Sequence, residues 1–323
     1  MSTRKATTFI TILCCVVLFF SLPAAQAENT PEISILTTVF PAYDFASVIV
    51  GDTANVQLLL PPGTESHSYE PTPQDIISIQ DADLFIYVGG ESDHWVENIL
   101  SSMGNDAPKA IRLMDCVAVV KEEYTLAMEH DHAHNEHEDH DHDEDHTAEL
   151  DEHVWTSPKN AMLIASSLAN TLTTLSPANE GIYSSNLQAY LTELEALDAA
   201  FTDVVANGKC SKVIFGDRFP LRYFVDAYQL QYDAAFPGCS EDSEPNIRTI
   251  MTLIDEIKTE EIPVVFYIEF SSQKTANIIA EETGAKTLLF HSCHNVSFDE
   301  MENGASYLSL MRSNVDALKE ALN

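Results

Sequence analysis

Histidine dominates the residues of this chain that could do chemistry. The sequence has 12 histidines, and seven of them lie in one acidic stretch, "EHDHAHNEHEDHDHDEDH", at residues 129–146. Imidazole is the commonest side-chain metal ligand, and His-rich tracts are typical of metal binding. A stretch this polar buries too little apolar surface to offset its ordering entropy, so we expect a disordered loop over residues 129–149 that collects metal only loosely. Its candidate ligands are His130, His132, His134, His137, His140, His142 and His146.

Five further histidines lie outside this tract: His67, His94, His153, His291 and His294. His67 follows the apolar run "VQLLL", and His291 follows the run "KTLLF". His153 comes just after the acidic tract and ahead of an expected helix. Because ligands collect at the carboxyl ends of parallel strands, these three residues suit one site between two lobes. His94 is interpreted as structural, and His294 fits either a structural or a ligand role.

The elements that must position these side chains alternate between strand and helix. "EISILTTVFPAYDFASVIVG" favours a strand followed by a helix, and similar units recur before the tract and after Gly208. Between them, residues 176–207 carry apolar side chains at helical spacing, without Pro or Gly after position 181. We therefore predict an α/β fold of two lobes, 28–175 and 208–323, each a mainly parallel sheet flanked by helices and joined by one long rigid helix.

The N-terminus has the pattern of an export signal. Arg4 and Lys5 precede the apolar run "FITILCCVVLFFSL", and "PAAQA" follows it. This pattern predicts a signal peptide over residues 1–27 and a protein of the periplasm or the outer face of the cell membrane. Leu13 before Cys14 makes a poor lipoprotein acylation site, so a lipid anchor is disfavoured, and the choice between a free and a tethered protein stays open.

Charge and cysteine content narrow the partners and the compartment. The chain has 51 acidic against 16 basic residues, a formal net charge of −35. This excess argues against nucleic acid or an anionic membrane as partner and favours cations. Four cysteines follow the signal peptide: Cys116, Cys210, Cys239 and Cys293. In an exported protein we expect one or two disulfides, with three possible pairings if all four are used, and Cys293 competes as a metal ligand.

Two motifs make the chain recognisable. "PPGTESHSYEPTPQDI" resembles the Gly-x-x-x-His-x-Tyr-Glu-Pro motif of the zinc- and manganese-binding solute receptors of ABC transporters. "DEHVWTSPKNA" is similar to that family's Asp-x-His-x-Trp-x-Ser-Pro motif, and a His-rich acidic insertion before it is typical of the zinc-specific branch. The resemblance covers essentially the whole mature chain. It implies a monomeric, non-enzymatic receptor that captures Zn²⁺ between its lobes and delivers it to an ABC-transporter membrane permease.

The resemblance also implies a ligand set. His67 and His153 match the histidines of the two motifs. The family's fourth ligand is normally an acidic residue after a late strand, and His291 stands at about that point here. Three imidazoles suit the borderline-soft Zn²⁺ ion.

The family's third histidine has no counterpart in this chain. In "FGDRFPLRYFVDAYQL", Gly216, Asp217 or Arg218 occupies its place, depending on the register. Asp217 is therefore the expected oxygen ligand, although it could equally pair with Arg218 or Arg222. Glu269 is a weaker candidate near the cleft.

Three alternatives stay open at this point. A receptor of the same type could carry Mn²⁺ instead of Zn²⁺. A secreted zinc hydrolase would need a general base beside an activated water, as in His-Glu-x-x-His, and the sequence lacks that pattern. A metal buffer working only through the tract would leave the two-lobe body without a purpose.

Overall fold

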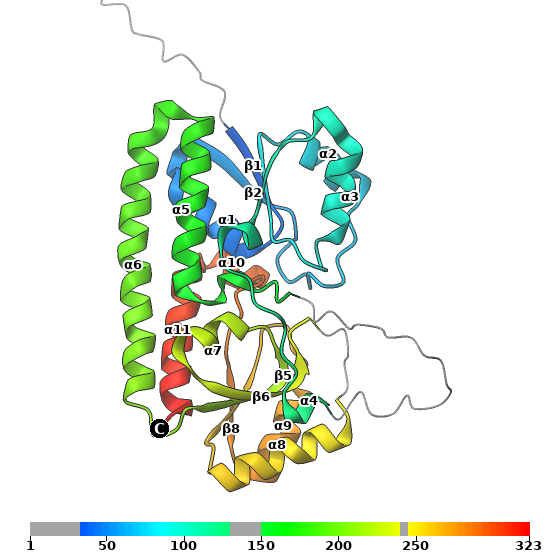
Figure 1. The fold of residues 1–323 in the computed structure, drawn as a ribbon, viewed down its shortest axis with the longest axis vertical. Coiled ribbons are helices and arrows are strands. Elements are labelled where there is room, and N and C mark those ends of the chain that lie inside the picture. Colours follow the sequence, from blue (N-terminus) through cyan, green and yellow to red (C-terminus); the bar gives the residue numbers. More distant parts are fainter. Residues whose placement is uncertain (1–32, 130–149, 240–244) are drawn as a thin grey trace, which may run out of the picture. The chain divides into compact units, whose positions relative to one another are not determined.

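The computed structural model describes residues 33–129, 150–239 and 245–323. The predicted signal peptide and the seven histidines of the tract lie outside these residues. The first sheet has four parallel strands in the order β2-β1-β3-β4, and Figure 1 labels β1 and β2 of this sheet. Its strands are β1 (Ile33–Thr37), β2 (Ala54–Leu58), β3 (Leu84–Tyr87) and β4 (Lys109–Arg112). In the central strand β1, Ile35 pairs with Val56 on one side and Leu84 on the other.

Helices alternate with these strands, as a parallel sheet requires. They are α1 (Phe40–Val50), α2 (Pro73–Gln80), α3 (His94–Met103), α4 (Leu126–Glu129) and α5 (Pro158–Leu175). Short 3₁₀ turns connect them: η1 (Gly51–Thr53), η2 (Gly104–Asp106), η3 (Leu113–Cys116), η5 (Val154–Thr156) and η6 (Pro177–Asn179). Helix α2 begins at a capping box, in which Thr72 and Asp75 each accept a backbone amide of the other. This cap fixes the end of the loop that carries His67.

The second sheet repeats the parallel arrangement in the order β6-β5-β7-β8. Its elements are β5 (Lys212–Phe219), α7 (Arg222–Tyr228), β6 (Gln231–Pro237), α8 (Ile247–Glu260), β7 (Val264–Tyr267), α9 (Lys274–Thr283), β8 (Lys286–Leu289), α10 (Phe298–Glu302) and α11 (Tyr307–Ala321). The pairing of β5 with β6 shifts register between Phe215 and Arg218. Such irregularities re-aim side chains near functional sites, and this one lies at the carboxyl end of β5.

One long helix connects the two sheets. Helix α6 (Glu180–Ala206) has 27 residues, which corresponds to about 40 Å at 1.5 Å per residue. It contacts α1 and α5 of the first half and α7 and α11 of the second. Its buried side chains include Tyr190, Leu194 and Phe201, which join a hydrophobic cluster containing Phe45 of α1 and Phe215 of β5. The helix is therefore part of a core shared by both halves.

The predicted fold class is confirmed: two parallel sheets flanked by helices, with one long helix between them. Strands β4 and β6 were missed, and each is an edge strand of its sheet. The short run "KAIR" has a single β-branched residue and the run "QYDAAFP" has none, so neither shows the β-branched enrichment that marks a strand. In the part of the chain that the structure describes, no helix is both long and apolar enough to span a lipid bilayer.

The disulfide prediction is wrong. The four cysteines are free thiols: Cys116, Cys210, Cys239 and Cys293. Cys116 Sγ lies 3.7 Å from the carbonyl of Arg112, and Cys210 Sγ lies 3.6 Å from that of Ala321. These thiols therefore belong to different parts of the fold, and neither of them meets a cysteine among the described residues.

Candidate metal centre

Three histidines meet between the two sheets. His67 comes from the loop after β2, His153 from the segment before η5, and His294 from the loop after β8. One ring nitrogen of each lies within 4.8 Å of those of the other two. The ring centroids form a nearly equilateral triangle with sides of 5.4, 5.2 and 5.4 Å. Nitrogens around tetrahedral zinc are about 3.4 Å apart at Zn–N distances of about 2.0–2.1 Å, so a modest contraction would close this histidine cluster on an ion.

The histidine cluster lines a small cavity of about 20 Å³. A cavity needs about 10–15 Å³ to hold one water molecule, so this one can take a guest of ionic size. Glu65, Arg218 and Glu269 also line it. Arg218 Nη2 lies 2.6 Å from Glu65 Oε2, and this ion pair joins the loop after β2 to strand β5.

Asp151 orients His153. The carboxylate of Asp151 lies 3.1 Å from His153 Nδ1 and accepts the backbone N–H of His153 at 2.8 Å. The other ring nitrogen, Nε2, is buried and has no hydrogen-bond partner among the residues that the structure describes. Burial works to lower the pKa of His153, but Asp151 outweighs it and raises that pKa above its ordinary value. A histidine held at Nδ1 by a carboxylate and left open at Nε2 is the usual state of a metal ligand.

Ser92 and Glu152 hold His67 in a similar way. The Ser92 hydroxyl donates to Glu152 and lies 2.6 Å from His67 Nδ1, so it accepts the proton of that nitrogen. Glu152 can come this close because Gly90 has no side chain: a Cβ at Gly90 would lie 2.6 Å from Glu152 Oε2. Burial and the nearby His153 and Arg218 lower the pKa of His67 to about 3. His67 therefore stays a neutral ligand at physiological pH.

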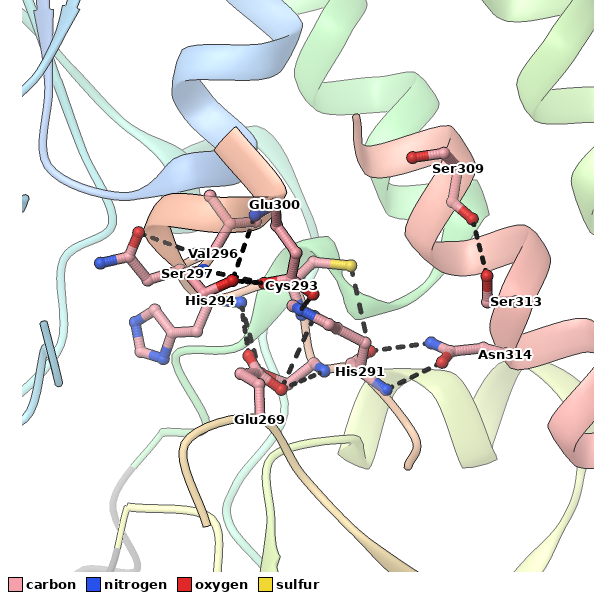
Figure 2. A network of polar contacts seen from close by, with 12 residues as sticks. Glu269, His291, Cys293, His294, Val296, Ser297, Glu300, Ser309, Ser313 and Asn314 are labelled. Atoms are coloured by element: carbon pink, nitrogen blue, oxygen red, sulfur yellow. Dashed lines mark hydrogen bonds and ion pairs between the residues drawn. The ribbon is translucent and has the colours of Figure 1, made fainter. Parts of the chain in front are cut away.

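Backbone contacts position His294. The carboxylate of Glu269 accepts the backbone N–H groups of Ser292 at 2.8 Å and of His294 at 3.1 Å. Figure 2 shows the His294 ring turned away from Glu269 and His291. Ser66 Oγ contacts this ring, at 2.8 Å from Nε2. Burial and the two other cluster histidines hold the pKa of His294 well below its usual range.

The structure places His291 outside the histidine cluster, contrary to expectation. Asn314 of α11 brackets its backbone, accepting from the N–H and donating to the carbonyl at 2.8 Å each (Figure 2). His291 Nδ1 accepts the N–H of Cys293 at 2.9 Å, and Nε2 lies 3.6 Å from Glu300. Nδ1 of His291 is therefore engaged inside the second half, whereas Nε2 is buried and faces Glu300 without a hydrogen-bond partner among the described residues. Four residues after His291, the loop reaches the first half, where Asn295 donates to the carbonyls of Pro61 and Thr64 in the loop after β2.

Asp217 also lies apart from the grouped ligand atoms. Its carboxylate accepts the backbone N–H of Arg218 at 2.9 Å and that of Ile268 at 3.3 Å. Among the described residues, Asp217 is thus neither a member of the histidine cluster nor the ion-pair partner of an arginine. The guanidinium of Arg218 pairs with Glu65, and that of Arg222 pairs with Glu123 and Asp226.

Gly216 explains why the third family histidine is missing. A Cβ at this position would lie 2.5 Å from the Cα of Ala276 in α9. Real Cβ atoms do not approach backbone this closely, so α9 leaves no room for any side chain here. A histidine at position 216 is therefore excluded by packing, and the structure supplies its third imidazole from His294 instead. The second histidine of "HSCHN" was the available signal for it.

The residues that directly follow the predicted His-rich loop are anchored just before His153. Lys121 and Leu150 form an antiparallel bridge, and the N–H of Asp151 donates to the carbonyl of Val120 at 2.9 Å. The predicted metal-collecting loop therefore ends only a few positions before His153 in the sequence.

Known proteins share this chain's sequence and fold. Zinc-binding lipoprotein AdcA of Streptococcus pneumoniae is 30% identical over 317 residues, covering 98% of this chain and 61% of AdcA. High-affinity zinc uptake system protein ZnuA of Bacillus subtilis is 33% identical over 297 residues, covering 90% of this chain and 88% of ZnuA. The Zn(II)-bound ZnuA-like domain of Streptococcus pneumoniae AdcA superposes with a TM-score of 0.73 at 27% identity, covering 90% of this chain and 99% of that domain.

This chain thus spans about three fifths of AdcA and nearly the whole of its ZnuA-like domain. The family model described as zinc-uptake complex component A, periplasmic, matches residues 35–321. The match extends from β1 to the end of α11 and includes all three histidines of the cluster. The chain belongs to this family of zinc-uptake components.

Proposed function

We propose that this protein is an extracytoplasmic receptor that captures Zn²⁺ with His67, His153 and His294 and delivers it to the membrane permease of an ABC transporter. The observation that carries the proposal is the convergence of three ring nitrogens within 4.8 Å on a small cavity. The proposed ligand set replaces His291 by His294 and omits Asp217. The names of the relatives and the Zn(II)-bound structure of one of them support zinc as the cargo.

The donor atoms favour zinc over manganese. Imidazole suits Zn²⁺, whereas Mn²⁺ prefers carboxylate, carbonyl and water oxygens. The carboxylates beside the histidine cluster are engaged elsewhere: Asp151 with His153, Glu269 with backbone amides, and Glu65 with Arg218. A Mn²⁺ receptor would therefore have to break these contacts to gain oxygen ligands.

The same engagement argues against a zinc hydrolase. Hydrolysis at a three-histidine zinc site needs an open position and a general base that can reach the bound water. The Glu269 carboxylate accepts hydrogen bonds from two amides and a hydroxyl of the loop after β8, and Glu65 is neutralised by Arg218. Capture and release of the ion is the function that these groups support.

The remaining features fit a receptor for scarce zinc. We propose two lobes, 28–175 and 208–323, with 176–207 between them, acting as an exported monomer. Residues 129–149 would gather ions near the cluster, because this segment ends close to His153. A net charge of −35 draws cations toward the protein.

Matched histidine variants test the proposal. We expect His294→Ala to weaken the tightest zinc-binding event by more than the 10–100-fold that loss of a residue orienting a metal ligand costs. His291→Ala is the control, since it removes an imidazole three positions away. Isothermal titration calorimetry with protein lacking residues 130–149 measures the zinc affinity of both variants. Loss of tight binding in His291→Ala, with His294→Ala unchanged, would overturn the proposed ligand set.

A further inference from the structure

A second group of metal-ligating side chains adjoins the histidine cluster. A ring nitrogen of His67, a carboxylate oxygen of Glu152 and the sulfur of Cys239 all lie within 4.8 Å of one another. Glu152 comes from the segment before η5, and Cys239 follows the end of β6. The side chain of Glu152 is buried, and Cys239 is half-buried. The two groups have only His67 in common.

The chemistry of this second group is that of a transition-metal site. Cysteine sulfur, histidine nitrogen and carboxylate oxygen are all accepted zinc ligands, and three protein ligands leave one position open. Cys239 is a free thiol, and its backbone N–H donates to Glu122 Oε1 at 2.9 Å, which fixes the residue beside the group. The proposed receptor function uses neither the thiol of Cys239 nor a direct bond from Glu152.

His67 links the two groups and prevents them from being filled together. Its Nδ1 faces Ser92 at 2.6 Å and Glu152 at 3.3 Å. A neutral imidazole offers only one lone pair to a metal. An ion bound with Glu152 and Cys239 therefore competes for His67 with an ion bound by His153 and His294.

The hydrogen bonds set the order of the two positions. Binding in the histidine cluster keeps the Ser92 contacts that orient His67. Binding beside Glu152 through Nδ1 must break the contact of Ser92 with His67, because that nitrogen then has no proton to donate. The histidine cluster is thus the better organised position, and an ion in the second group should move on to it.

We propose that His67, Glu152 and Cys239 form a transfer site, which holds Zn²⁺ before the ion passes to His153 and His294. This inference rests on the proposed function. When the ion binds, the Cys239 thiol releases its proton to solvent and coordinates as a thiolate. When the ion moves on, the sulfur takes a proton back, so the protein is unchanged after each passage.

Cobalt(II) reports directly on sulfur ligation, because a Co²⁺–thiolate bond gives an intense near-ultraviolet charge-transfer band that histidine ligands do not. The experiment titrates the full mature chain with Co²⁺ under anaerobic conditions. In His294→Ala, where the cluster is broken, we expect this band to develop. It should be lost when Cys239→Ser is added and kept when Cys116→Ser, the matched cysteine control, is added instead.

The unmodified chain should show no thiolate band with its first equivalent of Co²⁺, since the histidine cluster binds that ion. A thiolate band at the first equivalent would make Cys239 a ligand of the tight site and would overturn a separate transfer site. A band that survives Cys239→Ser would overturn it as well.

His153→Ala provides a second background, and far-ultraviolet circular dichroism shows that each variant is folded. Absence of the band in both backgrounds, with tight zinc binding lost, would overturn the transfer site and leave the proposed function standing. Tight zinc binding that persists in both backgrounds would instead remove the proposed function and this inference with it.

Discussion

The two halves of the site hold their histidines by different means. In the first half, acidic side chains act on the rings: Asp151 contacts Nδ1 of His153, and Glu152 acts on His67 through Ser92. In the second half, the Glu269 carboxylate accepts backbone N–H groups of the loop after β8. It therefore positions His294 without contacting the ring of that residue. The first half thus sets tautomer and charge, whereas the second half sets only position.

Removing the Glu269 carboxylate, which positions the His294 loop, should have the largest effect on zinc affinity and stability. Glu269→Ala leaves buried N–H and O–H donors of the loop without an acceptor, at a cost of about 1–3 kcal/mol in the free energy of unfolding. The loop that carries His294 should relax, and zinc affinity should fall by about 100-fold, the upper end for residues that orient a ligand. Urea unfolding and zinc titration measure the two effects. Glu302→Ala, which removes an exposed acid of α10, is the control.

Unchanged zinc affinity in Glu269→Ala would contradict this role for the loop. A loss of stability alone would mean that Glu269 supports the fold without positioning His294.

Neutralising Asp151, which orients His153 in the first half, should lower zinc affinity by a smaller factor. Asp151→Asn keeps an oxygen that can accept the Nδ1 proton of His153 but removes the negative charge that raises its pKa. We expect zinc affinity to fall by about 10-fold and the pKa of His153 to fall. Zinc titration and the NMR pH titration of the metal-free protein check both. A rise in the pKa of His153 would contradict the stated electrostatic cause.

The pH dependence of zinc binding should show that the three histidines differ in their pKa values. The pKa of His67 is lowered to about 3 and that of His294 lies well below its usual value, so neither ring takes up the second proton that would make it an imidazolium ion between pH 5.5 and 7.5. The pKa of His153 is raised, so zinc displaces a proton from this ring at pH values below that pKa. The apparent Kd should rise by about tenfold per unit fall in pH, the effect of one competing proton.

Competition titrations with a chromophoric chelator across this range measure that slope. A slope near three protons would mean that all three rings are basic in the metal-free protein. A flat profile would mean that His153 is already neutral.

The difference between the halves also explains what the sequence could predict. His67 and His153 lie in continuous motifs, and Asp151 stands only two positions before the ring that it orients. For His153 the local sequence therefore contains both the histidine and its support, whereas His67 is held by Ser92 and Glu152 from later segments. The structure brings His67 and His153 together as expected. The strand–helix alternation likewise predicted both sheets, except for the edge strands β4 and β6.

His294 depends on contacts between distant segments. Two contacts decide which of His291 and His294 joins the cluster. Asn314 holds the backbone of His291 inside the second half, and the loop after β2 contacts Asn295, the residue next to His294. The exclusion of a side chain at Gly216 depends in the same way on Ala276 of a later helix. Periodicity and spacing do not report such contacts, so the second half of the site could not be predicted from sequence alone.

Anomalous scattering at the zinc edge, from crystals of the zinc-loaded protein, tests the central claim most directly. The account predicts one strong peak at about 2.0–2.1 Å from a ring nitrogen of each of His67, His153 and His294. The ring of His291 should lie outside bonding distance of that peak. A peak bonded to His291 or to Asp217, with His294 turned away, would contradict it.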